Sequence, residues 1–194
     1  GRLAVFTYKP AAYRDGPLIV VFHGVLRNAE EYRDHARALA ERHGAVVVVQ
    51  LTHLNALWSP SPVPVVGAQD YTPHVLGEEE IEFLLQTYAD AAEVAKNTGA
   101  DGIEIHCAHE TVGYSFLSPV TNRRTDRWGG GPRERIRFVV EALRRVRERV
   151  GDALALGIRI NGQESRQGGY DNMELREMLY AIGEVGEAIP NTLY

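Results

Sequence analysis

The stretch GIEIHCAHETVGYSFLSP at residues 102–119 indicates the class of fold. It begins with the apolar run GIEI, which is typical of a buried strand, and then presents two histidines, His106 and His109, where that strand ends. In parallel α/β sheets, ligands bind beyond the carboxyl ends of the strands. The stretch therefore predicts a functional loop at the end of a parallel strand.

Strand-like and helix-like segments alternate on both sides of this stretch. The predicted strands cover 3–8, 18–22, 45–51, 101–106 and 153–160. The predicted helices cover 28–44, 78–99, 132–150 and 172–189, and the proline-rich segment 55–76 is predicted to be a loop. This β-α-β order predicts an α/β fold with a mainly parallel sheet, either an open doubly wound sheet or a partial (β/α)8 barrel. We expect a single domain over 1–194.

Composition narrows the possible partners. The chain has 194 residues, of which 44% are hydrophobic and 24% charged, with a net charge of −5. It has no basic block and no apolar run near the roughly 18 residues of a membrane span, so we expect neither nucleic acid nor membrane as a partner. The single cysteine, Cys107, excludes an internal disulfide and fits a reducing cytoplasm, the expected location.

The two histidines allow three interpretations. Imidazoles three residues apart can each donate a hydrogen bond to one oxygen atom and stabilise negative charge that develops on a carbonyl. They can instead bind a metal together with Glu104 or Glu110, although no second cluster supplies a convincing further ligand. In the third interpretation, one histidine packs in the protein and the other is solvated.

Two other polar residues follow apolar strands. Gln50 could bind the edge of a heterocycle through its amide, or could cap the following loop. Arg159 is costly to bury unless it meets an anion or an electron-rich ring, and a salt bridge to a neighbouring carboxylate is the alternative. His23-Gly24 also follows a predicted strand.

Residues from about 46 to 169 resemble the Old Yellow Enzyme family, the NADH:flavin oxidoreductases built on an FMN-binding TIM barrel. The resemblance covers only the central strands of that barrel. Its most specific part is HCAHETVGYSFLSPVTNRRTDRWGG at 106–130, which is similar to the family pattern H-G-A-H-G-Y-L-L-x-Q-F-L-S-P-x-x-N-x-R-x-D-x-Y-G-G. Three further segments carry it: QLTHLN at 50–55, the helix and strand at 77–106, and GIRINGQE at 157–164.

The resemblance implies a flavoprotein that uses FMN as cofactor and NAD(P)H as reductant. Hydride would pass through the flavin to a small-molecule substrate, an activated alkene or enone. It implies that His106 and His109 hold the carbonyl oxygen of the substrate. It also implies that Gln50 faces the flavin pyrimidine ring and that Arg159 lies by the N1 and O2 edge of the ring.

The chain departs from the family at the histidine loop. The family has a tyrosine that gives a proton to the substrate where this chain has Thr111, and a glycine where it has Glu110. Threonine is a much weaker acid than a phenol. Tyr114 is therefore the predicted substitute as proton donor.

The N-terminal segment, about 3–44, resembles an α/β-hydrolase of the polyester-depolymerase or esterase type, with His23-Gly24 at its oxyanion loop. The domain would then join a hydrolase-like part, 1–45, to a flavin-oxidoreductase-like part, 46–194. The nucleophile elbow G-x-S-x-G of that fold is absent, and no histidine follows His109, which argues against a serine hydrolase. A catalytically inactive chimeric scaffold is the main alternative to the oxidoreductase. Uncovered strand edges would favour a homodimer.

Overall fold

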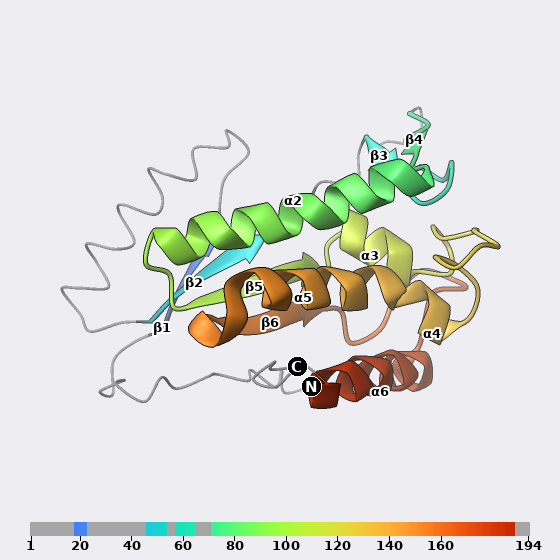
Figure 1. Cartoon of the computed structure of the whole chain (residues 1–194). Helices are drawn as coiled ribbons and strands as arrows, with labels where there is room; N and C mark the ends of the chain where they lie inside the picture. Colours follow the sequence, from blue (N-terminus) through green and yellow to red (C-terminus); the bar gives the residue numbers. More distant parts are fainter. Residues whose placement is uncertain (1–17, 23–45, 54–56, 65–70, 189–194) are drawn as a thin grey trace.

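A parallel sheet forms the centre of the computed structural model, which describes residues 18–22, 46–53, 57–64 and 71–188 (Figure 1). Its strands are β1 (Leu18–Phe22), β2 (Val46–Leu51), β5 (Gly102–Cys107) and β6 (Ala155–Ile160). They lie in the order β1-β2-β5-β6, and every neighbouring pair is parallel. The predicted α/β class with a parallel sheet is confirmed.

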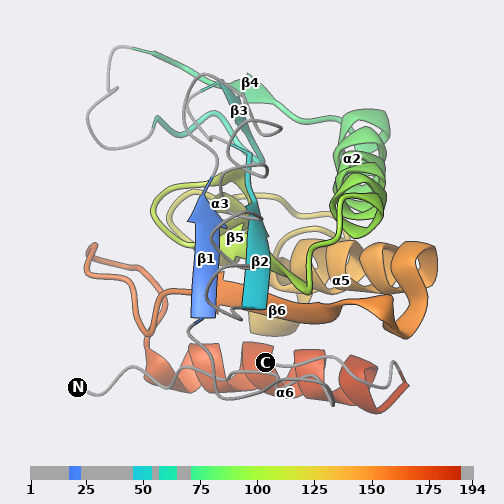
Figure 2. The same ribbon diagram turned by 90° about the vertical axis from the view of Figure 1, so that its left-hand side faces the viewer.

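Helices cover one face of the sheet and continue beyond its β6 edge. They are α2 (Glu78–Asn97), α3 (Val112–Leu117), α4 (Pro132–Arg135), α5 (Arg137–Val150) and α6 (Asn172–Ala188), with a 3-10 turn η1 at Gly151–Ala153. Helices α2 and α5 lie side by side over the sheet, and α6 runs below them (Figures 1 and 2). No described helix combines the length and the apolar character that crossing a membrane requires.

Local sequence explains where the long helix α2 begins and ends. Its first turn carries three glutamates, whose charges favour the positive end of the helix dipole. The Glu80 carboxylate accepts a hydrogen bond of 2.8 Å from the Gly77 amide, which satisfies one free donor of the helix start. The chain leaves the helix at Gly99, whose φ of +83° lies in the left-handed region that glycine adopts readily.

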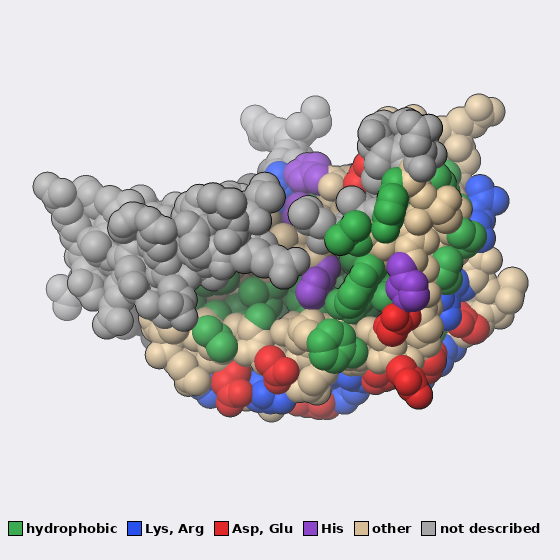
Figure 3. All heavy atoms as spheres, turned by 90° about the horizontal axis from the view of Figure 1, so that it is seen from above, with side chains coloured by type: hydrophobic (Ala, Val, Ile, Leu, Met, Phe, Trp, Pro, Cys, Tyr) green, Lys and Arg blue, Asp and Glu red, His purple; other side chains and the backbone are tan. Residues whose placement is uncertain are grey.

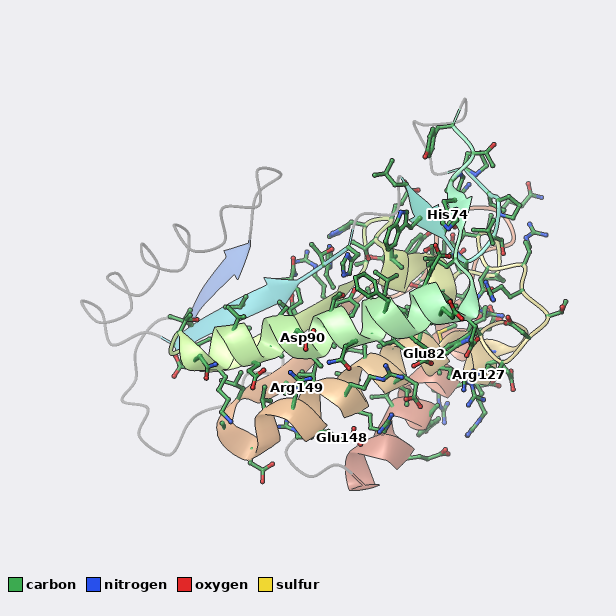
Figure 4. The ribbon with its side chains drawn as sticks, turned by 45° about the horizontal axis from the view of Figure 1, so that its top comes forward. His74, Glu82, Asp90, Arg127, Glu148 and Arg149 are labelled. Atoms are coloured by element: carbon green, nitrogen blue, oxygen red, sulfur yellow. The ribbon has the colours of Figure 1, made fainter. Side chains whose placement is uncertain are left out.

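The apolar core lies between the sheet and the helices α2 and α5. Ile103 and Ile105 of β5 are buried against residues of both helices, among them Leu84 and Val139. Ion pairs join the two helices at the surface, as Figure 4 shows for Arg149 of α5, whose Nη1 lies 2.9 Å from Asp90 Oδ1. Exposed pairs of this kind contribute little to stability, so burial of the apolar side chains holds the layers together.

The structure corrects three expectations on element boundaries. The segment 55–76 is not wholly a loop, because β3 (Trp58–Ser59) and β4 (His74–Val75) pair as a small parallel sheet. The region after His109 contains the helix α3 where a loop was expected. The helix expected over 132–150 is divided at Ile136 into α4 and α5.

Several expectations lie outside the described residues. They are the strand at 3–8, the helix at 28–44, the hydrolase-like segment as a whole except for β1, and His23-Gly24.

Candidate functional site

Polar side chains gather on the sheet face opposite α2 and α5. Side chains alternate between the two faces of a strand, so Glu104 and His106 point away from the core that Ile103 and Ile105 fill. Register partners in a parallel sheet share a face, and Gln50 pairs with Glu104 while Arg159 pairs with His106. The sequence-predicted residues of three strands are thus brought to one face.

His106 is buried and incompletely hydrogen-bonded. It is the penultimate residue of β5, with 8% of the residue exposed, and among the described residues its Nδ1 atom has no hydrogen-bond partner. Burial, followed by the neighbouring His109 and Arg159, lowers the pKa of His106 to about 4. The ring is therefore neutral at pH 7 and carries one N–H donor.

His109 lies against His106. The two ring centroids are 5.1 Å apart and the ring planes meet at 62°. His109 is exposed, so the pair combines one buried and one accessible imidazole. This geometry suits two donors that approach one ligand atom. Figure 3 shows that histidine side chains, in purple, reach the surface among hydrophobic ones.

A strained turn holds the pair in place. His109 and Glu110 have φ angles of +50° and +58°, a left-handed conformation that costs a non-glycine residue roughly 1–2 kcal/mol. The family pattern has glycine at the position of Glu110, where this conformation would carry no such cost. Strain of this kind persists only where surrounding structure holds it, and it is frequent at functional sites.

Thr111 fixes the turn to the end of β5. Its hydroxyl donates a 2.9 Å hydrogen bond to the His106 carbonyl, and its Oγ1 accepts one from the Tyr114 amide as the N-cap of α3. Helix α3 packs directly on β5, since a Cβ on Gly113 would lie 2.8 Å from the Cys107 sulfur. The hydroxyl of Thr111 is thereby committed to the backbone.

Gln50 is hydrogen-bonded to the carboxylate of Glu104, which was not expected to be its partner. The Gln50 Nε2 atom donates to Glu104 Oε1 at 2.5 Å, and Gln50 is only 5% exposed. This bond does not match the expected cap on the following loop. The alternation of side chains along the strand places Glu104 on the same face as His106, and the sequence shows this. That Gln50 lies opposite Glu104 follows only from the register of β2 and β5.

Arg159 lies on the same face of the sheet as His106. Within the described part of the chain, no carboxylate forms an ion pair or hydrogen bond with the Arg159 guanidinium. The alternative of a salt bridge to a neighbouring carboxylate is therefore not observed there. A fixed cation that no described carboxylate neutralises suits an anionic or electron-rich ligand.

Tyr114 has a different set of contacts. Its hydroxyl donates to Glu164 Oε1 at 2.6 Å, and Ser118 donates to the same oxygen at 2.8 Å. Tyr114 is 4% exposed, and burial together with the Glu164 hydrogen bond raises its pKa. Among the described residues, no hydrogen bond or ring contact joins the phenol to either imidazole. Glu164 was not among the residues expected at the site.

The loop 119–131 makes contacts that hold backbone segments together. Asn122 Nδ2 donates to the carbonyls of Phe116 and Trp128, at 2.8 and 2.7 Å. The Arg124 guanidinium binds Asp126 and donates to the Leu76 carbonyl at 2.6 Å. These contacts support the site from outside and do not enter it.

A metal centre receives no support from the geometry. In the ranges that the structure describes, no group of three or more His, Cys, Asp or Glu side chains is placed to hold a metal ion.

Comparison with known proteins identifies a family. The model of the NADH:flavin oxidoreductase / NADH oxidase family matches residues 19–193. An NADH oxidase from Thermoanaerobacter brockii is 39% identical over 130 residues, which are 66% of this chain and 20% of that protein. A probable N-methylproline demethylase from Rhizobium meliloti is 31% identical over 189 residues, covering 91% of this chain and 27% of the relative.

Solved structures show the same relationship in three dimensions. Morphinone reductase in complex with tetrahydroNAD has a TM-score of 0.73 at 26% identity, over 88% of this chain and 58% of the other. Histamine dehydrogenase from Rhizobium sp. 4-9 has a TM-score of 0.72 at 28% identity, over 82% and 25%. The chain thus spans between about a fifth and three fifths of the length of these proteins. Members of the matched family use FMN with NAD(P)H as reductant.

Proposed function

Because the chain belongs to the NADH:flavin oxidoreductase / NADH oxidase family, we propose that it carries part of an FMN site that reduces an activated alkene or enone. The observation that carries the proposal is the His106 and His109 pair, whose ring centroids lie 5.1 Å apart. The His106 ring is buried and its Nδ1 atom has no hydrogen-bond partner among the described residues, whereas the His109 ring is accessible. The pair stands at the carboxyl end of a parallel strand, where such folds bind ligands.

The donor set on the sheet face fits a flavin ring. Gln50 offers an amide, which can donate and accept along the edge of a pyrimidine ring. Arg159 supplies a cation that no described carboxylate neutralises, and such a charge stabilises a ring edge that becomes negative on reduction. We assign these two residues to the ring, and no residue to the phosphate.

The chemistry supplied by bound FMN is hydride transfer from NAD(P)H to the substrate. The two histidines bind the substrate carbonyl oxygen, each through one N–H, and polarise the conjugated double bond. His106 acts as a neutral donor, because its lowered pKa keeps the ring uncharged at neutral pH. The buried position of His106 strengthens this hydrogen bond relative to one made in water.

Tyr114 is the proposed proton donor to the substrate. Thr111 is excluded from this role by its bond to the His106 carbonyl. Delivery from Tyr114 requires its hydroxyl to leave Glu164, and the raised pKa of the phenol makes it a weak acid. We therefore expect proton transfer to be the slow part of alkene reduction in this chain.

The alternative is a catalytically inactive α/β scaffold that joins a hydrolase-like segment to a flavin-oxidoreductase segment. The family model begins at residue 19, inside the hydrolase-like segment 3–44, so the flavoprotein match extends across the proposed join. This overlap favours the oxidoreductase over the chimera.

A visible absorption spectrum of the purified chain, with and without added FMN, tests the proposal. Flavin that stays with the protein through gel filtration supports the site, and bound flavin should then be bleached by NAD(P)H and restored by an enone. If the folded protein retains no flavin, the result would favour the inactive scaffold.

A further inference from the structure

The carboxylate of Glu104 has no role in the function proposed above. It lies on the face that carries Gln50 and His106, and it is partly buried. A carboxylate is costly to place inside a sheet face unless it is hydrogen-bonded. The Gln50 amide supplies that hydrogen bond, so the two side chains form one unit.

This unit fixes the direction of the Gln50 amide. A carboxylate only accepts hydrogen bonds, so the amide must turn its nitrogen toward Glu104 and its oxygen away. The nitrogen bonds Glu104 Oε1 at 2.5 Å, and the two residues are register partners on β2 and β5. The amide then presents its carbonyl oxygen and its second N–H in one defined order to a ligand.

We propose that Glu104 is a positioning residue that orients Gln50 toward the pyrimidine edge of the flavin. The proposal rests on the FMN site proposed above. A pyrimidine edge alternates donors and acceptors, so it meets an amide correctly in one orientation and poorly in the flipped one. Without the carboxylate, both orientations of the amide would be open.

The charge of Glu104 has a second consequence. The carboxylate adds a negative charge near the ring edge that reduction makes negative, and it opposes the effect of Arg159 on the same face. Loss of that charge should make the bound flavin easier to reduce. Loss of the amide orientation should therefore weaken FMN binding, whereas loss of the charge should shift the reduction potential of the bound flavin.

Three variants separate these effects. Glu104→Gln keeps the size of the side chain, removes the charge and permits both amide orientations. Glu104→Asp keeps the charge but withdraws it from Gln50. Glu79→Gln, at an exposed position in the first turn of α2, is the matched control for loss of one negative charge. Circular dichroism establishes that each variant is folded.

The measurements are the dissociation constant for FMN, from quenching of its fluorescence, and the reduction potential of the bound flavin. Glu104→Gln should weaken FMN binding by about tenfold and shift the potential to a more positive value. Glu104→Asp should weaken binding while leaving the potential near that of the wild type. Glu79→Gln should change neither quantity.

A double-mutant cycle with Gln50→Ala tests whether Glu104 acts through Gln50. In the Gln50→Ala background, Glu104→Gln should have no further effect on FMN affinity. Unchanged affinity and potential in Glu104→Gln, or affinity losses that simply add, would overturn the positioning role alone. A wild-type chain that binds no FMN would overturn this role together with the proposed function, so the two failures are distinguishable.

Discussion

His106 and Arg159 are register partners on the adjacent parallel strands β5 and β6, so an imidazole and a guanidinium share one face of the sheet. Burial is the main cause of the lowered pKa of His106, and His109 and Arg159 lower it further. Each of these influences disfavours the imidazolium ion. The site therefore holds one permanent cation beside a histidine that stays neutral down to about pH 4.

The lowered pKa of His106 predicts an acid-sensitive stability. The folded pKa is about 4 and the ordinary value is 6.5, so the unfolded chain binds the proton more readily. The contribution of the neutral ring to stability is complete above pH 6.5 and is lost as the pH falls toward 4, by roughly 3 kcal/mol.

Urea unfolding of wild type and His106→Gln at pH 7.5 and pH 5 measures this contribution. The free energy of unfolding of the wild type should fall more between the two pH values than that of His106→Gln, which has no titratable group at the position. An equal fall in both proteins would show that His106 titrates normally in the folded state.

The central strands and the long helix could be predicted because short-range patterns determine them. The run at 45–51 is rich in β-branched valine, and its residues Val46–Leu51 form β2. Helix α2 is marked by its acidic first turn and by Gly99 after its end. The helix α3 was missed because it is short and depends on the cap by Thr111 and on close packing of Gly113 against Cys107.

The sequence placed the candidate site residues near strand ends, but it did not indicate the hydrogen bonds that connect them. Gln50, His106 and Arg159 lie near the carboxyl ends of apolar strands and His109 lies just beyond one, which is a pattern that the local sequence shows. The bond between Gln50 and Glu104 joins residues 54 positions apart, and it exists only because β2 and β5 pair in this register. Likewise, the partner of Tyr114 comes from the segment after β6, which no local pattern connects to α3.

Replacement of the histidines should separate substrate activation from flavin binding. In protein loaded with FMN, His106→Ala and His109→Ala should each slow enone reduction by about 100-fold, because each removes one donor from the carbonyl oxygen. The rate at which NAD(P)H reduces the flavin should change far less. Stopped-flow absorbance resolves the two half-reactions, and equal losses in both would contradict the oxygen-holding role.

Tyr114→Phe tests the proton donor. Removal of a general acid slows a reaction by at least about 100-fold. We expect the rate of enone reduction to fall by about this minimum, because the Tyr114 hydroxyl is already hydrogen-bonded to Glu164. Ser118→Ala, which removes the other hydroxyl on the same carboxylate oxygen, is the control for damage to this network. Comparable losses in the two variants would assign Tyr114 a structural role instead.

The outer edge of β6 predicts self-association. In the described residues, β6 pairs with β5 on one side only, and the backbone groups on its other side have no strand partner. Such an edge can pair with another chain, so we expect a homodimer. Size-exclusion chromatography with light scattering at micromolar concentration should give twice the 21.5 kDa mass of the chain, with dissociation on dilution. A 21.5 kDa species at every concentration would mean that the edge is covered within the chain itself or remains solvated.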